Sequence, residues 1–464
     1  MFDKKVYVTR RKVLAQDMGD GIILIPGNSE APCNYPDNCY KFRQDSTFLY
    51  FFGISHPDMI GTIDAQTGEE IIFGDDVDID DIIWMGPQVS VKEKAAQVGV
   101  KKSKKYSEIF NYIAQAKKQK KKIHFIPPYR YQTKILLNEL LNIPIAQLKS
   151  KASEKLIKAI VSQRIVKDKY EIAEIDLACN IGYAMHYAVM SSCKIGMSEQ
   201  ELAGMMDGIA QQLGAMNSFA TILSQHGETL HNHLHNGIIT KGKLLTVDAG
   251  AENNNNYCSD FTRTIPCSGK FTTKQKEIYN IVLECNNLAT KMAKPGISYF
   301  DVHVAVYKNM AKRLKELGLI KGDVDEAVEA GAPALFMPHG LGHNMGLDVH
   351  DMENYGENYV GYSKEIKRDK RSGFGSLRMA RKLVVGNVIT NEPGIYFIPA
   401  LIEKWKKEKI CAQFINFSKL KDYYDFGGIR LEDDLLITPN GNRLLGAKRL
   451  PITVKEVEQV MRGK

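Results

Sequence analysis

The sequence has no CxxC pair, and its eight cysteines are irregularly spaced along 464 residues. Neither a disulfide framework nor a zinc knuckle is expected from this spacing, which fits a reducing compartment. The N-terminal stretch MFDKKVYVTRRKVLAQ lacks the apolar core of a signal peptide, and the run GIILIP is far too short to cross a membrane. We therefore expect a cytoplasmic protein with no membrane partner.

No stacking motif or recognition helix accompanies the basic residues. The formal charge of +8 comes from scattered lysines, and the densest run is KKQKKK at residues 117–122. Such a run is typical of a solvated helix face or loop, so no nucleic-acid partner is expected. The hydrophobic fraction of 44% and the charged fraction of 25% are ordinary for a globular protein.

The chain is too long for one ordinary core, and two or three domains are expected. Up to about residue 147, short β-rich runs alternate with charged, helix-compatible segments, which predicts an α/β domain with a largely buried sheet. These runs are GIILIP, TFLYFFGI, MIGTID, EEIIF and KKIHFIP. The lysine-rich segment 149–169 is predicted to be a connecting helix.

Apolar residues recur at helical spacing from Lys169 to Met190, which predicts a long amphipathic helix at the start of a second domain. The predicted domains are therefore residues 1–160 and 161–464. In the second, strand-like runs such as KLLTVDAG and NVITNEPGIYF alternate with helical runs such as QKEIYNIVLECNNLATKMA. This alternation indicates an α+β arrangement.

Histidines occupy every second position in LHNHLHNG, namely His231, His233 and His235. On a β-strand these side chains would share one face, as three imidazoles around a zinc ion require. Another pair, His339 and His343, has the spacing of a helical zinc site. The prolines and glycines around that pair disfavour a helix, so its two imidazoles need not converge.

Four segments of the second domain place acids or histidines beside glycine and proline: VDAGAENNNNYCSDFTRT, MPHGLGHNMGLDVHD, NEPGIY and GGIRLEDDLLIT. Singly, each acid could be a turn or cap residue or part of a surface ion pair. Together, two aspartates, two glutamates and a histidine form an oxygen-rich donor set that could hold two divalent ions about 3.5–4 Å apart. Such a set suits Mn, Co or Zn better than a soft metal.

In this order, the motifs LHN, DAG…SDFTRT, HGLGHNMGLDVHD, NEPGIYF and GGIRLEDD resemble the catalytic motifs of the pita-bread metallopeptidases. The resemblance is to the proline-specific branch, which contains prolidase and aminopeptidase P. The first domain is similar to that of the family through FRQDSTFLYFFGISHPDMIGTIDAQTGEEIIF and IWMG. The resemblance implies an α/β N-terminal domain, an α+β pita-bread catalytic domain, and hydrolysis of the Xaa-Pro bond.

The resemblance also implies two divalent metal ions, for which we expect manganese, with cobalt, zinc or iron as alternatives. Asp260 and Glu432 would bridge the two ions, and Asp248 and His343 would each belong to one side. The five implied ligands are Asp248, Asp260, His343, Glu392 and Glu432.

The resemblance also implies roles for other residues around the metal ions. His231 falls on the substrate-side histidine of the family, so LHNHLHNG is not expected to hold a metal, and the family assigns no role to His233 or His235. His350 matches a histidine that contacts the substrate or the developing charge, and Glu392 matches the carboxylate that transfers a proton. His339 would pack in the outer layer of the substrate site. Arg430 would orient Glu432 through a charge-assisted hydrogen bond.

The choice within the branch depends on spacing. Arg378 falls where prolidases place an arginine for the C-terminal carboxylate of a dipeptide, and the 40-residue interval from Glu392 to Glu432 also resembles prolidase. In contrast, the short span from His231 to Asp248 is closer to aminopeptidase P. We expect a prolidase-type Xaa-Pro dipeptidase, with an Xaa-Pro aminopeptidase that acts on longer peptides as the alternative. A homologue that binds peptides without hydrolysis is a further alternative.

Trp84, in IWMG, matches a tryptophan that in prolidases reaches the active site of a neighbouring subunit, which implies a homodimer. An apolar anchor under a loop is the alternative for this residue. The charged stretch 355–381 is predicted to be either a lid or a solvated surface insertion.

Overall fold

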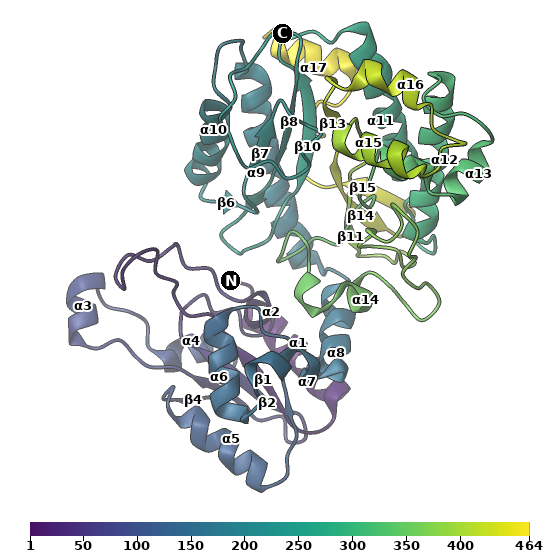
Figure 1. Ribbon diagram of the computed structural model, residues 1–464. Helices are drawn as coiled ribbons and strands as arrows, with labels where there is room; N and C mark the ends of the chain where they lie inside the picture. The colour runs from purple at the N-terminus through teal and green to yellow at the C-terminus, as the bar shows by residue number, and fades with distance from the viewer. Residues whose placement is uncertain (464) are drawn as a thin grey trace. The chain divides into compact units, whose positions relative to one another are not determined.

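The computed structural model describes residues 1–463 and divides them into two compact units (Figure 1). The N-terminal unit comprises Met1–Arg164 and Met352–Tyr359, and the C-terminal unit comprises Ile165–Asp351 and the chain from Val360 onward. The boundary predicted near residue 160 lies inside helix α8 (Glu154–Arg164), and the division falls at the end of that helix. Within residues 1–463, none of the helices combines the length and apolar character that a membrane crossing requires.

A five-stranded mixed sheet forms the centre of the N-terminal unit, with strand order β4-β3-β2-β1-β5. Its strands are β1 (Ile22–Pro26), β2 (Ile60–Asp64), β3 (Glu70–Phe73), β4 (Lys102–Lys104) and β5 (Ile123–His124). Apolar residues of this sheet and of helices α5 and α6 share one core. They include Ile22, Leu24, Ile71, Phe73, Ile109, Ile113, Leu137 and Leu140.

Short helices complete this unit before the crossing into the C-terminal unit (Figure 1). They are α1 (Lys4–Met18), α2 (Ser46–Phe52), α3 (Ile79–Met85), α4 (Val91–Gln97), α5 (Glu108–Lys118), α6 (Tyr131–Leu141), η1 (Ile145–Gln147), α7 (Leu148–Lys151) and α8 (Glu154–Arg164).

The run TFLYFFGI is not a strand, as the sequence had suggested, but helix α2. The side chain of Asp45 caps its first turn by accepting from Thr47 N and Phe48 N, and Gly53 ends it in the left-handed conformation. Every residue of the helix is buried, so the run has no polar face. A short apolar run without a polar face has no periodicity that separates helix from strand.

The predicted connecting helix over 149–169 is also wrong in its extent. Helices α7 and α8 share this region, and α8 ends at Arg164. A new helix, α9 (Lys169–Ser192), begins after a capping box between Asp168 and Glu171. This helix confirms the long amphipathic helix that the spacing predicts for the start of the second domain.

The C-terminal unit contains two three-stranded sheets and two smaller ladders. The strand orders are β10-β8-β7 and β11-β14-β15, and the ladders are β12-β13 and β6-β9. The strands are β6 (Met216–Asn217), β7 (Ile222–Ser224), β8 (Leu244–Ala249), β9 (Ala251–Glu252), β10 (Phe261–Pro266), β11 (Val388–Asn391), β12 (Gly394–Tyr396), β13 (Gly428–Arg430), β14 (Asp433–Thr438) and β15 (Gly441–Leu444).

Helices cover the sheets of this unit. Helices α9 and α10 pack beside β7, β8 and β10, and α11 packs beside β11, β12 and β13 (Figure 1). The remaining bounds are α10 (Glu199–Gln212), α11 (Thr273–Met292), α12 (Tyr299–Glu316), α13 (Val324–Glu329), η2 (Ala332–Leu335), α15 (Pro399–Glu408), α16 (Phe417–Leu420), η4 (Lys421–Tyr423) and α17 (Val454–Met461).

The charged stretch 355–381 divides between the two units. The stretch begins at the last residue of η3 (Glu353–Tyr355) and continues through α14 (Glu357–Val360). Tyr355 is buried in the N-terminal unit, where its hydroxyl contacts Thr47 and accepts from Arg164 Nη1 at 3.2 Å. Further along, apolar residues anchor the stretch in the C-terminal unit, namely Tyr362, Phe374, Leu377 and Met379.

Gly342 shows how closely the HGLGH segment approaches β11. A Cβ at this position would lie 2.1 Å from Thr390 O. By contrast, Gly204 on α10 has no atom within 4 Å of an added Cβ. Only glycine therefore allows the close contact at position 342, whereas no packing contact requires glycine at position 204.

We expect Gly342→Ala to lower the free energy of unfolding by about 1–3 kcal/mol, because the methyl group pushes against the backbone of β11. Gly204→Ala is the matched control and should raise it by about 0.5–1 kcal/mol, because alanine favours the helix. Urea unfolding followed by circular dichroism measures both. Equal effects of the two substitutions would contradict the close approach.

Candidate metal centre

Three of the predicted ligands meet in the C-terminal unit. Asp260, His343 and Glu432 are buried, and each offers a ligand atom within 4.8 Å of the other two. Asp260 directly precedes β10, His343 lies in the irregular HGLGH segment, and Glu432 lies between β13 and β14. The absence of a helix at His343 agrees with the expectation from its prolines and glycines.

His343 presents an unprotonated nitrogen to carboxylates. Burial lowers the pKa of His343 well below its usual range, and its Nδ1 donates to Asn344 O at 3.1 Å. The other nitrogen, Nε2, lies 3.4 Å from Asp260 Oδ2 and 3.6 Å from Glu392 Oε1. In a neutral ring with Nδ1 protonated, Nε2 carries a lone pair, which cannot donate to either oxygen. A cation placed between these atoms would satisfy all three.

Glu392 stands at the edge of this group, with 18% of its side chain exposed. Burial raises the pKa of Glu392 to about 7, with Arg430 opposing and the charge of Asp248 adding to the shift. Its Oε1 is 3.4 Å from Thr390 Oγ1, and its Oε2 is 3.6 Å from His339 Nδ1. Glu392 is therefore held beside His343 without a strong cationic partner.

Asp260 and Glu432 are the most deeply buried acids of the group. Burial, together with repulsion from neighbouring carboxylates, raises the pKa of each well above its usual range. Glu432 Oε2 accepts from Thr262 Oγ1 at 2.6 Å, and the backbone N–H of Asp260 donates to Asp434 Oδ2 at 2.9 Å. Asp260 Oδ1 is buried with no hydrogen-bond partner.

Arg430 pairs with Asp248, not with Glu432, so the predicted hydrogen bond is wrong. Its Nη2 donates to Asp248 Oδ2 at 2.6 Å, and its Nε donates to Thr262 Oγ1 at 3.1 Å. Thr262 is opposite Asp248 in the β8–β10 pairing and also bridges to Glu432. Thr262 lies between the two acids, so the hydrogen bonds that connect Arg430 to Glu432 pass through this hydroxyl.

Tyr396 links Arg430 to His339. Burial lowers the pKa of His339 to about 3, and the neutral ring donates from Nδ1 to Gly340 O at 2.8 Å. Its Nε2 then accepts from the hydroxyl of Tyr396 at 2.9 Å, and that oxygen accepts from Arg430 Nη1 at 2.8 Å. This order of donors fixes the tautomer of His339.

Two side chains with predicted substrate roles lie next to the cluster. The rings of His343 and His350 meet edge to face, with their centroids 4.3 Å apart. Arg378 Nη1 lies 3.5 Å from His350 Nε2. The structure thus brings His350 and Arg378 together with the predicted ligands.

The three alternating histidines lie on an irregular loop, so they do not share a strand face. His231 is exposed, and partial desolvation and the charge of Arg430 lower its pKa, against the charge of Asp248. His233 is exposed, and His235 Nδ1 contacts Leu223 O at 3.1 Å. In the described part of the chain, these rings join no cluster of metal-ligating atoms.

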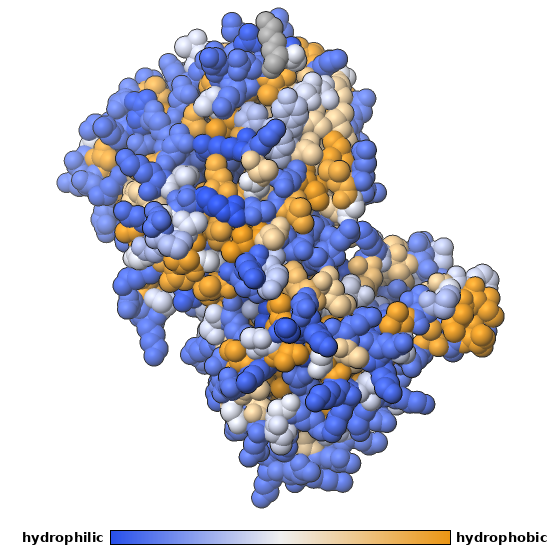
Figure 2. All heavy atoms as spheres, turned by 180° about the vertical axis from the view of Figure 1, so that it is seen from behind, coloured by the Kyte–Doolittle hydropathy of each residue, from blue (hydrophilic) through white to orange (hydrophobic). Residues whose placement is uncertain are grey.

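Trp84 lies on α3 of the N-terminal unit, and 86% of it is exposed. No residue of this helix is buried, so the alternative of an apolar anchor under a loop is wrong. Figure 2 shows apolar side chains gathered on the projecting α3 segment at its right-hand edge. They include Ile79, Ile83, Trp84 and Met85, each more than 60% exposed.

Sequence reasoning missed Thr262 and Tyr396, although both lie inside the quoted motifs. On β10, Thr262 is two residues from Asp260, and alternate residues of a strand share a face. That spacing was a usable signal for Thr262. Tyr396 has no comparable signal, because its contact with His339 crosses 57 residues of sequence.

The donor set fits divalent metal ions. Asp248 Oδ1 and Asp260 Oδ1 are both buried without a partner, and His343 Nε2 faces two carboxylates with its lone pair. Buried carboxylates usually have a counter-charge or a metal ion. Arg430 forms an ion pair with Asp248 Oδ2, which leaves Asp248 Oδ1 and Asp260 Oδ1 available to a cation. Asp248 and Glu392 lie outside the closest group of three but border it.

Known proteins match both units of the chain. The model of "Metallopeptidase family M24" matches residues 173–439, and that of "Aminopeptidase P, N-terminal domain" matches residues 7–124. A probable Xaa-Pro aminopeptidase from Fusarium vanettenii is 33% identical over 449 residues, which cover 95% of this chain and 91% of that protein.

Solved structures agree over the full length. A variant of Escherichia coli aminopeptidase P in complex with substrate has a TM-score of 0.81 at 28% identity, covering 100% of this chain and 99% of that one. The zinc-substituted E. coli enzyme in complex with product gives the same TM-score of 0.81, at 28% identity and the same coverage of 100% and 99%. The predicted α/β N-terminal domain and pita-bread catalytic domain are confirmed. The chain belongs to metallopeptidase family M24 and is a proline-specific pita-bread metallopeptidase with an aminopeptidase P-type N-terminal domain.

Proposed function

We propose that the protein is an Xaa-Pro aminopeptidase, which removes the first residue from peptides with proline in second place. The relatives that match over almost the whole chain are named Xaa-Pro aminopeptidases, which supports this alternative over the prolidase that the spacing of Arg378 favoured. The observation that carries the proposal is the buried group of Asp260, His343 and Glu432, whose ligand atoms lie close together and include a buried carboxylate oxygen with no hydrogen-bond partner.

Two divalent ions would be held by the five predicted ligands. We infer manganese as the native metal, because oxygen-rich sites with one imidazole suit it, although such sites also accept cobalt, zinc and iron. When bound, the ions make water a strong nucleophile near neutral pH and polarise a carbonyl oxygen. The five ligands are Asp248, Asp260, His343, Glu392 and Glu432.

Glu392 would move the proton. Its partly exposed carboxylate borders His343 and is open to a water molecule that attacks the carbonyl before proline. It would accept the proton of that water and return it to the proline nitrogen as the peptide bond breaks. Burial raises the pKa of Glu392 to about 7 in the metal-free protein, which supports a role for this carboxylate in proton transfer.

His231 and His350 would bind the substrate. His350 is held between the ring of His343 and the guanidinium of Arg378, so its position is fixed before substrate arrives. Donors placed in advance near a developing oxyanion stabilise the transition state. Proline lacks an N–H, so a pocket that offers no acceptor for an amide hydrogen favours Xaa-Pro bonds.

Arg378 would bind a carboxylate on the C-terminal side of proline. In a dipeptide this is the carboxylate of proline itself, and in a longer peptide it lies further away. Within this proposal Arg378 increases the affinity for short peptides but is not required for cleavage.

We also infer that α3 is a self-association surface and that the protein is a homodimer. Exposed apolar patches mark interaction sites, and the patch on α3 includes Trp84. A cytoplasmic location completes the proposal.

Metal-stripped protein should cleave Ala-Pro-Ala only after Mn is added, releasing alanine, and should cleave Ala-Pro more slowly. The measurement is alanine release with and without Mn.

Glu392→Gln is the control and should lower kcat at least about a hundredfold, because it removes the proton acceptor. Arg378→Ala should slow Ala-Pro more than Ala-Pro-Ala, and Lys382→Ala, an exposed cation of the same segment, should change neither.

Cleavage of Ala-Pro alone would contradict this proposal and restore the prolidase interpretation. If neither peptide is cleaved by metal-loaded protein, the proline-specific function is wrong and a peptide-binding role replaces it.

In metal-free protein, Glu392→Gln should change the pH dependence of stability. The pKa of Glu392 is raised from 4.5 to about 7 in the folded state, so its contribution is present at low pH and is lost as pH rises through 7. Glutamine does not ionise, so the variant does not lose stability in this way as pH rises. The stability of the variant relative to wild type should therefore increase by about 2–3 kcal/mol between pH 5 and pH 8.

Urea unfolding in chelator at several pH values measures this difference. A constant difference over the whole range would show that folding does not shift the pKa of Glu392.

Trp84→Glu should convert the dimer into a monomer, because a carboxylate replaces the most exposed apolar side chain of α3. Light scattering coupled to size-exclusion chromatography measures the mass. Tyr131→Glu is the control, since Tyr131 is 70% exposed on α6, and it should leave the mass unchanged. A wild-type monomer, or a dimer that survives Trp84→Glu, would exclude this surface.

A further inference from the structure

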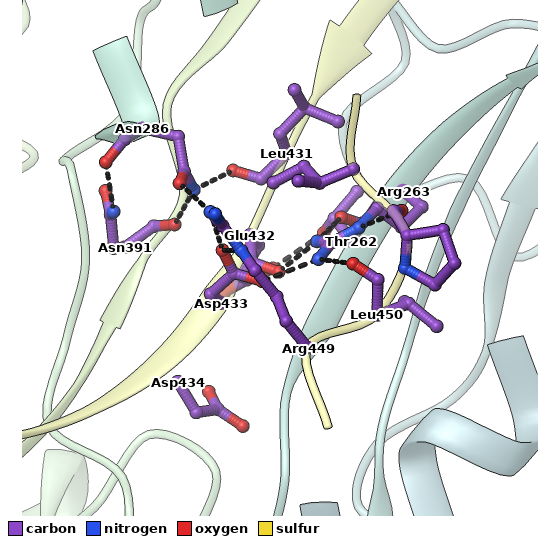
Figure 3. A network of polar contacts seen from close by, with 12 residues as sticks. Thr262, Arg263, Asn286, Asn391, Leu431, Glu432, Asp433, Asp434, Arg449 and Leu450 are labelled. Atoms are coloured by element: carbon purple, nitrogen blue, oxygen red, sulfur yellow. Dashed lines mark hydrogen bonds and ion pairs between the residues drawn. The ribbon is translucent and has the colours of Figure 1, made fainter. Parts of the chain in front are cut away.

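Asn286 is a fully buried asparagine on α11, and its side chain points toward Asn391 and Leu431 (Figure 3). Its Nδ2 donates to Asn391 O and to Leu431 O, each at 3.2 Å. Asn391 directly precedes Glu392, and Leu431 directly precedes Glu432. One side-chain amide thus joins the two backbone segments from which the glutamates project.

Strand pairing is interrupted at this place. The β11–β14 pairing ends at Asn391 and Asp433, and the β12–β13 pairing begins at Gly394 and Arg430. Between them, Pro393 has no N–H to donate, and the bond from Leu431 N to Pro393 O (3.2 Å) crosses the interval. Regular ladder hydrogen bonds normally set the distance between neighbouring strands. Here the side-chain amino group of Asn286, on α11, donates one hydrogen bond to each of the two strand ends and so connects them across the interval.

Asn286 is itself held in one orientation. Its Oδ1 accepts from Arg449 Nη2 at 2.9 Å, so its amino group points to the strand ends. Arg449 Nη2 also donates to Asp433 Oδ2 at 2.8 Å, and Asp433 Oδ1 accepts from Arg263 Nη2 at 2.6 Å. Arg263 in turn donates from Nη1 to Glu432 O at 2.6 Å. The chain of contacts that begins at Asn286 therefore returns to Glu432 (Figure 3).

The backbone of α11 makes a reciprocal contact with the first strand end. Asn391 Nδ2 donates to Asn286 O at 2.9 Å and to Thr290 Oγ1 at 3.0 Å. Asn286 and Asn391 are thus joined by a hydrogen bond in each direction. This exchange fixes β11 to the helix next to Glu392.

We propose that Asn286 is a positioning residue that sets the separation of the Glu392 and Glu432 carboxylates for a two-metal site. The inference rests on the proposed function, because it takes both glutamates as ligands. Loss of the amide leaves two buried carbonyls without this donor and Arg449 without this acceptor, so the two segments lose their common anchor. A site with bridging carboxylates needs both ions at a defined spacing and is sensitive to such a change.

The experiment compares Asn286→Ala and Asn286→Asp with wild type in the full chain. Metal-free protein is titrated with Mn by calorimetry, and kcat and KM are measured with Ala-Pro-Ala. We expect the first ion to bind as in wild type and the second to bind about 10–100-fold more weakly, the range typical of residues that orient ligands. At limiting Mn, kcat should fall while KM stays within about threefold.

Asn442→Ala is the matched control. Asn442 on β15 also donates to two carbonyls of this region, Thr290 O and Ala293 O, the second at 2.7 Å, but it touches neither glutamate segment. The Asn442→Ala protein should bind both Mn ions with the affinities of wild type. Thermal melting identifies a variant that fails to fold. If Asn286→Ala does so, the isosteric Asn286→Asp decides the question.

Equal affinity for the second ion in the Asn286 and Asn442 variants would overturn the role of Asn286 and leave the proposed function intact. A wild-type protein that binds no second ion, or cleaves without metal, would overturn the proposed function itself and the inference with it. The two failures are therefore separated by the wild-type measurement.

Discussion

The interaction on which the site depends is the repulsion between carboxylates that the fold buries together. Asp260 and Glu432 are both shielded from water, and each raises the cost of ionising the other group. Arg430 neutralises Asp248, and Thr262 gives Glu432 a hydroxyl, but neither contact cancels the charge of the group. A bound cation would offset this repulsion, and the neutral nitrogen of His343 faces one of the same carboxylates.

Antiparallel register brings the site together from distant parts of the sequence. Asp248 lies opposite Thr262 in the β8–β10 pairing, and Thr262 bridges to Glu432. A shift of one residue would turn these side chains to the other face of the sheet. The helices behind the sheets have a comparable role, because buried polar side chains such as Asn286 tie the ends of the strands to them.

The order of motifs in the sequence predicted the fold class and identified five candidate ligands, of which the structure places Asp260, His343 and Glu432 close to one another. It could not predict features that depend on three-dimensional neighbours. The fully apolar run of α2 has no period that separates helix from strand, and the pairing of Arg430 with Asp248 crosses 182 residues. Spacing gave conflicting indications of the subfamily: the short span from His231 to Asp248 indicated aminopeptidase P, whereas the position of Arg378 indicated prolidase.

The path of the chain limits how the protein can be divided. Because Met352–Tyr359 belongs to the N-terminal unit, the polypeptide passes between the units three times. Deletion of residues 1–164 would remove the residues that bury Tyr355. Because Tyr355 lies five positions beyond His350, the deletion would leave an unsupported loop next to that histidine. The catalytic unit is thus not a separable module, and an evolutionary exchange of the N-terminal unit would require compensating changes within this short returning segment.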